Sequence, residues 1–217
     1  MRVVRGELML LLAVIMNSLG VVLLLYSGSG ISAISSVPFS LNLIMPALSL
    51  GTWTYLFQAF LILVLFDCRK KIVPSYLLSF VVGFFFGIFT DIHTIWVYAL
   101  PLNLPLRLAY FAIGYVIIAF GIAALNRCQM PLIPTDLFPR ELSQITSVSY
   151  AKVKISFDVV CLAVTIVLTL GFTGRVQGLG VGTVAAALTT GWAVDRIGSW
   201  MDRHWTFVSI FSRKELA

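Results

Sequence analysis

The stretch PLIPTDLFPR, residues 131–140, runs on into ELSQITSVSYAKVK as far as Lys154 and separates two long apolar runs. It brings three prolines together with the charged residues Asp136, Arg140 and Glu141, in a chain that is otherwise mostly apolar. Such a segment is costly near lipid, because its backbone groups and charges need partners there. We therefore expect it to lie at the working centre of the protein, as one member of a duplicated pair.

The composition is that of a membrane protein. The chain has 217 residues, of which 59% are hydrophobic and 11% charged, and its mean hydropathy is +0.99. Soluble domains have about 45–50% apolar and about 25% charged residues. The net charge of +6 does not indicate nucleic-acid binding, because no basic stripe with interleaved aromatic residues is present. We predict an all-α, polytopic membrane protein whose main partner is the lipid bilayer.

Six apolar runs have lengths near the roughly 17–25 residues that cross a bilayer core. They cover residues 7–26, 52–66, 73–90, 106–125, 153–172 and 178–194. With the amino terminus in the cytoplasm, all but Arg107 and Arg175 of the fifteen Lys and Arg residues fall on the inner side. We therefore predict six transmembrane helices with both termini cytoplasmic. The tail from residue 197 should form an amphipathic helix along the inner interface; the alternative is a short solvated tail.

The two halves of the chain resemble each other. The matching positions, at shifts of 100 or 101 residues, are Leu19-Gly20 with Phe120-Gly121, Pro38 with Pro139, and Phe57-Gln58 with Phe157-Asp158. Each half holds three predicted spans, an odd number, so the second half must be inverted in the membrane relative to the first. We expect a single transmembrane domain over residues 1–217, with inverted repeats at about 1–100 and 101–196 and the tail at 197–217. Many secondary transporters are built from such repeats.

A stripe of small residues that ends in aspartate also recurs. Ser79, Gly83, Gly87 and Asp91 match Thr183, Ala187, Gly191 and Asp195, all at a shift of 104. A spacing of four places each set on one helix face, where small side chains let two helices approach closely in lipid. Each stripe therefore predicts a close contact between helices.

Pro38 and Pro139 fall in corresponding interruptions, after the first span of each half. Each is followed by a run compatible with a helix, FSLNLI and RELSQI. Because proline is favoured at the first position of a helix, we predict two short broken or re-entrant helices that begin at these prolines. One would enter from each side of the membrane. Two ordinary surface loops are the alternative.

Asp158 is the strongest candidate for a functional side chain. It lies about one turn inside the fifth span and four residues after Lys154, so the two share a helix face and can form an ion pair. Gln58 is the neutral counterpart of Asp158 in the first half. Our hypothesis is that Asp158 couples protons or binds a cation, with Lys154 governing its protonation. The alternative is a structural ion pair at the inner interface.

Asp136 and Arg140 are further candidates. The Asp136 side chain could bond to nearby backbone donors and hold the turn ahead of the short helix. Arg140 would then lie at the helix start, where its guanidinium and the free backbone donors could hold an anion. Alternatively, Arg140 pairs with Asp136 or faces lipid headgroups. Together with Lys152 and Lys154, Arg140 should attract negative charge to the cytoplasmic mouth.

Other chemistry is weakly represented. The three cysteines have no CxxC spacing and no neighbouring histidine, and Asp91 with His93 lacks further metal ligands. The segment GLGVGT lacks the GK[ST] ending of a phosphate-binding loop. No Ser-His-Asp or Cys-His arrangement is evident. We expect no metal, no cofactor and no enzymatic activity.

The segments PLIPTDLFPREL, SYAKVKISFDVVCLAV and GLGVGTVAAALTTG resemble the YczE/YitT-like bacterial integral membrane proteins, in the branch with a PTDLFPREL-type motif. The resemblance covers nearly the whole chain and is most specific from Pro134 to Asp158. It implies a protein of the bacterial cytoplasmic membrane with an internally duplicated helical core and a role in transport. It supplies no catalytic residues.

The sequence therefore predicts a transporter or exporter of a small polar or anionic metabolite, working by alternating access with proton coupling. The alternative is a membrane scaffold that does not transport but recruits or stabilises a cytoplasmic enzyme. A homodimer is compatible with both. A polar cavity around Pro38 and Pro139 would favour transport, and a solid apolar interior there would count against it.

Overall fold

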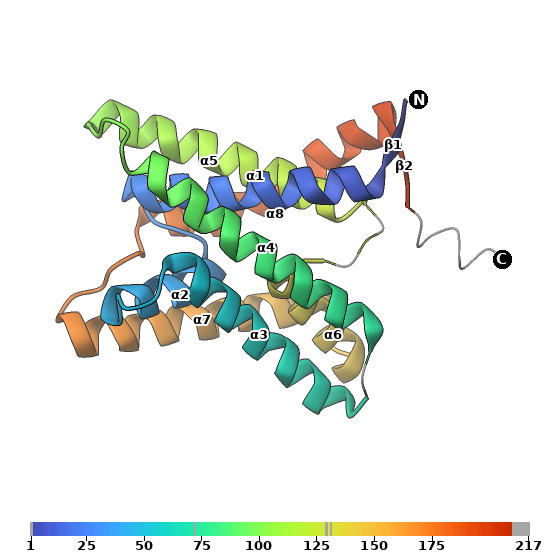
Figure 1. The fold of residues 1–217 in the computed structure, drawn as a ribbon, viewed down its shortest axis with the longest axis horizontal. Helices are drawn as coiled ribbons and strands as arrows, with labels where there is room; N and C mark the ends of the chain where they lie inside the picture. Colours follow the sequence, from blue (N-terminus) through green and yellow to red (C-terminus); the bar gives the residue numbers. More distant parts are fainter. Residues whose placement is uncertain (1, 72, 129, 131, 210–217) are drawn as a thin grey trace.

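The computed structural model describes residues 2–71, 73–128, 130 and 132–209. This part of the chain forms eight helices and two short strands (Figure 1). In chain order they are β1 (Arg2–Arg5), α1 (Gly6–Ser27), α2 (Ala33–Ile44), α3 (Leu50–Arg69), α4 (Pro74–Val97), α5 (Leu104–Leu125), α6 (Pro134–Thr146), α7 (Tyr150–Thr173), α8 (Val181–His204) and β2 (Trp205–Val208). The protein is an all-α polytopic membrane protein, as the composition predicts.

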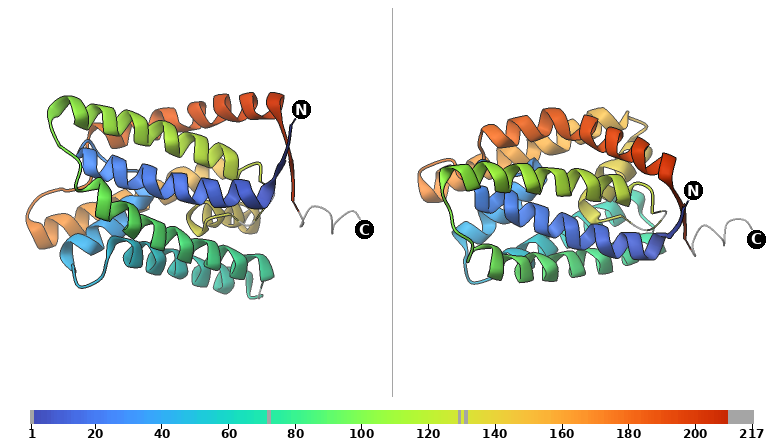
Figure 2. Two further views of the ribbon diagram at one scale, coloured as in Figure 1. Left: turned by 45° about the horizontal axis from the view of Figure 1, so that its top comes forward. Right: turned by 90° about the horizontal axis from the view of Figure 1, so that it is seen from above.

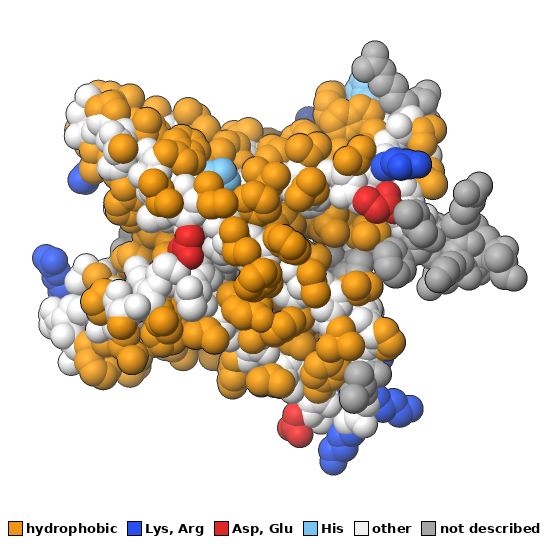
Figure 3. Space-filling model, in the orientation of Figure 1, with side chains coloured by type: hydrophobic (Ala, Val, Ile, Leu, Met, Phe, Trp, Pro, Cys, Tyr) orange, Lys and Arg blue, Asp and Glu red, His pale blue; other side chains and the backbone are white. Residues whose placement is uncertain are grey.

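Within the described residues, five helices are long and apolar enough to cross a membrane: α1, α3, α4, α5 and α7. They correspond to the first five predicted spans. The sixth predicted span lies in α8, which has 24 residues but contains several threonines, several glycines and the charged pair Asp195-Arg196. It is therefore less apolar than the other five. Hydrophobic side chains cover most of the face shown in Figure 3, as expected for a surface that contacts lipid.

Local side-chain chemistry sets several helix ends. Ser32, Ser49 and Asn103 precede α2, α3 and α5, and each accepts a hydrogen bond from a backbone N–H in the first turn. The carboxyl end of α1 is closed by Gly28, which adopts a left-handed conformation with φ 67° at little energetic cost, because glycine has no Cβ. These signals explain why α2 and α3 are separate helices although no charged residue divides them.

The short helices α2 and α6 occupy the two predicted interruptions, but they do not begin at Pro38 and Pro139. Each proline is the sixth residue of its helix, and each is buried. The predicted starts were wrong because better signals lie earlier in the chain: Ser32 caps α2 six residues before Pro38, and Pro134 opens α6 five residues before Pro139. The alternative of two surface loops was also wrong.

The helices pack in a pattern that relates the two halves. α1 packs on α4 as α5 packs on α8, α2 packs on α3 as α6 packs on α7, and α2 packs on α7 as α6 packs on α3. α1 and α5 form the most extensive contact of all. One relation is unmatched: α3 packs closely on α4, whereas α7 and α8 make no comparable contact and lie in different layers in Figure 1.

The crossing of α1 and α5 depends on glycine. A Cβ added to Gly121 would lie 2.2 Å from Oδ1 of Asn17, and one added to Gly20 would lie 2.5 Å from Cγ1 of Ile118. Gly20 and Asn17 are related to Gly121 and Ile118 by the shift of 101 residues. The two helices therefore meet in a reciprocal contact, of the kind that a two-fold axis produces.

The two ends of the described chain, β1 and β2, lie at the same end of the molecule (Figure 2). Strands β1 and β2 pair in parallel, with Arg2 opposite Trp205, and Arg127 binds Asp202 through two hydrogen bonds of 2.6 and 2.7 Å. Of the tail predicted as a helix, residues 197–204 are helical and continue α8, whereas residues 205–208 form β2. Asp202 and Trp205 find partners within the protein instead. Residues 210–217 of the predicted tail lie outside the described residues.

Candidate functional site

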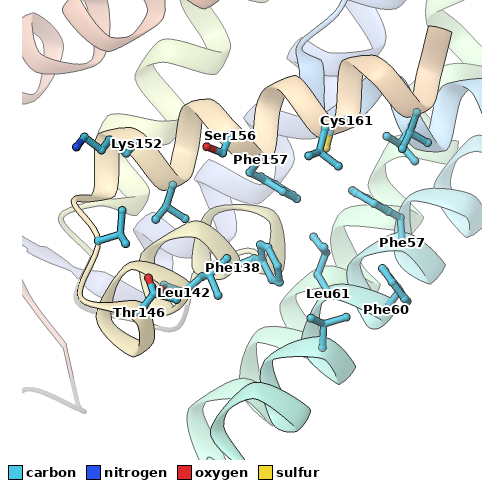
Figure 4. Close-up of a pocket in the computed structure, with 16 residues that line it drawn as sticks. Phe57, Phe60, Leu61, Phe138, Leu142, Thr146, Lys152, Ser156, Phe157 and Cys161 are labelled. Atoms are coloured by element: carbon cyan, nitrogen blue, oxygen red, sulfur yellow. Dashed lines mark hydrogen bonds between the residues drawn. The ribbon is translucent and has the colours of Figure 1, made fainter. Parts of the chain in front are cut away.

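A cavity of about 710 Å³ lies between α3 and α7, against α2 and α6 (Figure 4). Its lining is almost entirely apolar: Val37, Phe57, Phe60, Leu61, Val64, Phe138, Leu142, Thr146, Val148, Lys152, Val153, Ser156, Phe157, Val160, Cys161 and Val164. Only Thr146, Lys152 and Ser156 contribute polar side chains. The expected polar cavity is therefore absent from this place, because apolar residues of α3 and α7 face the cavity.

The cavity lies where the two halves of the chain meet. Ten of its sixteen lining residues are related in pairs by the spacing of the predicted repeat. At a shift of 100 these are Phe57 with Phe157, Phe60 with Val160, Leu61 with Cys161, and Val64 with Val164, and at a shift of 101 Val37 with Phe138. The same positions of both halves therefore face one shared space.

The short helices support this cavity from behind. Their prolines, Pro38 and Pro139, do not line it, but the residues just before them, Val37 and Phe138, do. The ring of Phe138 packs on that of Phe157, with centroids 4.9 Å apart. A second contact fixes α6 through Glu141, whose carboxylate lies 2.8 Å from the Arg69 guanidinium of α3 and accepts a hydrogen bond from the Tyr76 hydroxyl of α4. The wall formed by α6 is thereby tied to α3 and α4.

The predicted ion pair between Lys154 and Asp158 is present. Nζ of Lys154 lies 2.6 Å from Oδ1 and 2.7 Å from Oδ2 of Asp158, and both side chains are partly buried. Asp136 of α6 interacts electrostatically with this pair and with Arg140. The structure thus brings Asp136, Arg140, Lys154 and Asp158 into one charged cluster. Lys152 lies apart from it, on the wall of the cavity.

Asp136 and Arg140 do not have the local roles that we predicted from the sequence. Because α6 begins at Pro134, Asp136 lies inside its first turn, and among the described residues its carboxylate accepts no hydrogen bond from the backbone. Arg140 is the seventh residue of α6, too far along the helix to share the free N–H groups of the first turn. Arg140 is exposed. No anion site at a helix start is therefore formed by this arginine.

Gln58 lies behind the cavity rather than in it. Its side chain is 1% exposed and fills the space left by Gly83, where an added Cβ would lie 2.3 Å from Oε1 of Gln58. Within the described residues, neither this oxygen nor the hydroxyl of Ser79 has a hydrogen-bond partner. Gln58 therefore does not have the same environment as its counterpart Asp158, which is ion-paired.

The sequence reasoning missed Asn17. Its side chain is 5% exposed in the middle of α1, and its Oδ1 has no partner among the described residues. A signal was available, because an amide within a long apolar run is expensive in a membrane and often marks an interior contact. Asn17 occupies the α1–α5 crossing, opposite Gly121.

Asp91 joins α4 to α3. Its carboxylate accepts hydrogen bonds from the Ser49 hydroxyl at 2.5 Å and from the Gly51 N–H at 2.7 Å. Gly51 and Gly87 allow this approach, since a Cβ on Gly51 would lie 2.0 Å from the Gly87 carbonyl oxygen. The first stripe of small residues is therefore a close helix contact that ends in an aspartate, as predicted.

The corresponding contact is missing in the second half. Asp195 is exposed and, in the described part of the chain, forms no hydrogen bond or ion pair. A Cβ added to Gly191 would have no heavy atom within 4 Å. The second stripe predicts a helix contact that this structure does not contain.

Comparison with known proteins identifies the family but no activity. A family model described as a family of unknown function (DUF6198) matches residues 4–199, so the chain belongs to this family. No curated protein and no solved structure matches the chain. The resemblance to YczE/YitT-like proteins stays a prediction.

Proposed function

We propose that this member of the family transports a small amphipathic anion, an apolar molecule with one negative group, by alternating exposure of the cavity between two inverted repeats. We place it in the bacterial cytoplasmic membrane, and we keep its kinship with YczE/YitT-like proteins as part of the proposal. The observation that carries the proposal is the cavity wall, in which ten residues are paired by the repeat spacing. Transporters with inverted repeats bind substrate at this kind of interface.

The packing supports an inverted repeat. Two helix contacts within the first half have counterparts in the second, and the contact of α2 with α7 has its counterpart in that of α6 with α3. The two short helices also carry proline at the same position. The reciprocal contact of Gly20 and Gly121 adds a relation between individual residues. Since three independent features follow nearly the same shift, chance similarity between apolar segments does not account for them.

The positions of the termini support six crossings. The β1–β2 pairing puts both ends of the described chain at the same end of the molecule. Five crossings would separate these ends across the bilayer, so α8 serves as the sixth despite its lower hydropathy. The distribution of Lys and Arg favours the cytoplasm as the side of the termini.

The cavity favours an amphipathic substrate over a fully polar one. Its volume of about 710 Å³ lies within the range of about 300–1,000 Å³ that is usual for ligand sites. A polar metabolite would leave groups unpaired against these walls, at a cost of about 1–3 kcal/mol for each. An apolar body meets no such cost, and the Lys152 ammonium can pair with a negative group at the edge. We therefore narrow the predicted substrate from a small polar or anionic metabolite to an anion with an apolar body.

Asp158 is the proposed coupling residue. It belongs to the charged cluster on α6 and α7, and α7 forms one wall of the cavity. Protonation of its carboxylate would weaken its bond to Lys154 and so change the attachment of α7 to the cluster. In the first half Gln58 cannot titrate, so coupling is assigned to the second half alone.

Uptake of a fluorescent amphipathic anion, 8-anilinonaphthalene-1-sulfonate, into vesicles that contain the purified protein tests the cavity. Val160→Trp places a large ring in it and should strongly reduce saturable uptake, whereas Val159→Trp should not. The two valines are adjacent, each is 57% exposed, and only Val160 lines the cavity. Equal uptake by both variants would refute a role for the cavity, and absence of uptake by the wild type would favour the scaffold alternative.

The coupling role is tested in the same vesicles. Asp158→Asn should make uptake independent of an imposed pH gradient, while Asp67→Asn, at the exposed end of α3, should leave the dependence intact. If Asp158→Asn retains the wild-type response to the gradient, this residue does not couple transport to protons.

A further inference from the structure

The contact between α3 and α4 closes one end of the molecule. Asp91 binds the amino terminus of α3, where free N–H groups and the helix dipole favour a carboxylate. This is the end opposite to the chain termini, because α4 finishes near Tyr26 at the far end of α1, where the Tyr26 hydroxyl bonds to the Leu100 carbonyl. We call this set, Ser49, Gly51, Gly87 and Asp91, the α3–α4 gate.

The second half carries the parts of an equivalent gate, but they are not assembled. Ser149 precedes α7 as Ser49 precedes α3, at a shift of 100, and Gly191 and Asp195 correspond to Gly87 and Asp91, whereas the counterpart of Gly51 is Ala151. Ser149 does not cap α7 with its side chain, whereas Ser49 caps α3. The Ser149 side chain forms no bond elsewhere in the described chain, and Asp195 is likewise unbonded.

These unassembled parts lie at the end that holds the termini. α8 starts beside Ser29, whose carbonyl oxygen accepts a hydrogen bond from Gly182, and it ends at β2. Asp195 is in the half of α8 nearer β2. The structure is therefore closed between α3 and α4 at one end and open between α7 and α8 at the other.

We infer that α8 and the amino terminus of α7 come together in a second conformation, in which the Asp195 carboxylate binds the Ser149 hydroxyl and the free N–H groups of α7, with Gly191 at the point of closest approach. This α7–α8 gate closes the end of the molecule that is open here. The α3–α4 gate opens in exchange, because the two halves are inverted copies. The inference rests on the proposed function, because alternating access requires an exchange that exposes the cavity to each side of the membrane in turn.

Energetics permit the exchange. In each conformation one carboxylate is bound to a helix start and the other is hydrated, so the number of such bonds is conserved. Two conformations built from similar contacts can differ by only a few kcal/mol, which leaves both populated. Because Ala151 stands where α3 has Gly51, α8 cannot approach α7 as closely as α4 approaches α3. Asp195 and Ser149 are both exposed, so neither side chain has to leave a packed position.

Disulfide crosslinking in membrane vesicles tests the second gate. The three native cysteines, Cys68, Cys128 and Cys161, are free and are first replaced by alanine. The pair Ser149→Cys with Asp195→Cys should form an intramolecular disulfide on oxidation. The pair Ser149→Cys with Val181→Cys should not, because Val181 lies fourteen residues before Asp195, about 21 Å along α8.

A second variant tests the exchange between the gates. Asp91→Ala removes both bonds of the α3–α4 gate and should raise the yield of the Ser149–Asp195 cysteine crosslink by about tenfold or more, given the usual strength of hydrogen bonds to a charged group. No crosslink in either background would overturn the inference. So would a crosslinked band at twice the mass, which would place the contact between two copies of the chain.

The crosslink needs no substrate, so it separates this inference from the proposed function. A protein that forms the crosslink without taking up the fluorescent anion retains the α7–α8 gate but not the proposed transport. A protein that takes up the anion without ever forming the crosslink transports by another movement.

Discussion

Gly121→Ala should destabilise the protein through the α1–α5 crossing. The new Cβ would lie 2.2 Å from Oδ1 of Asn17, about 1.2 Å closer than the 3.4 Å at which ordinary contact begins. Asn17 is buried and cannot swing into solvent, so the helices must separate or strain, at a cost of about 1–3 kcal/mol. The better helix propensity of alanine offsets up to about 1 kcal/mol. We expect a net loss of about 1–2 kcal/mol, measured by titrating mixed micelles with sodium dodecyl sulfate.

Adding Asn17→Ala should rescue this loss. It removes the obstructing side chain together with its unpartnered oxygen. The double variant should therefore be at least about 1 kcal/mol more stable than the sum of the single changes predicts, since the two residues are in contact. Gly171→Ala is the matched control, because nothing lies within 4 Å of its added Cβ and stability should not fall. Strict additivity, or a Gly121→Ala variant as stable as the control, would refute the reasoning.

Three further predictions concern the ends of the molecule and α6. Arg127 lowers the pKa of Asp202, which lies beyond the predicted sixth span. The bond between them therefore stabilises the protein at neutral pH and is lost as the pH falls through that lowered pKa. In thermal melts, the unfolding free energy of Asp202→Asn should be lower than that of the wild type by at most about 1 kcal/mol at pH 7, and the two should become equal in acid. Glu141→Gln weakens the bond from Tyr76 and should increase amide hydrogen exchange across α6; unchanged exchange would contradict this anchor. Pro139→Ala restores a helix N–H but loses two buried ring carbons, for a net gain of about 1 kcal/mol in unfolding free energy; a clear loss would show that the proline ring itself shapes the packing.

Residue spacing within the sequence predicted those contacts of the site that form within a single helix. The Lys154–Asp158 ion pair follows from a spacing of four residues, and it is present. Asp136 and Arg140 were assigned wrongly because their roles depend on the residue at which α6 begins. We placed that start at Pro139, whereas the helix begins at Pro134. An error of five residues rotates and shifts every side chain relative to the helix start, and so removes the proposed anion site.

The polarity of the cavity was not predictable in the same way. A run of apolar residues indicates a span, but it does not say which of its faces meets lipid and which meets another helix. Phe57 and Gln58 are neighbours in the sequence, yet Phe57 lines the cavity and Gln58 is buried behind it. Only the packing of α3 against α4, α2 and α6 decides this assignment, and it turns apolar side chains of α3 toward the cavity.

The sequence by itself determined the all-α membrane class, the position of the apolar spans and the segment PLIPTDLFPR as an interruption between them. These properties depend on composition and on the length needed to cross a bilayer, which are local quantities. Pro131 of that segment lies outside the described residues, while Pro134 to Arg140 form the first half of α6. The tertiary structure alone decided that Phe138 of this helix meets Val37 at a shared cavity, and that Asp91 is bound while Asp195 is free among the described residues. The physical reason is that both results depend on contacts between residues about a hundred positions apart, and no local pattern specifies which of two related helix pairs is closed.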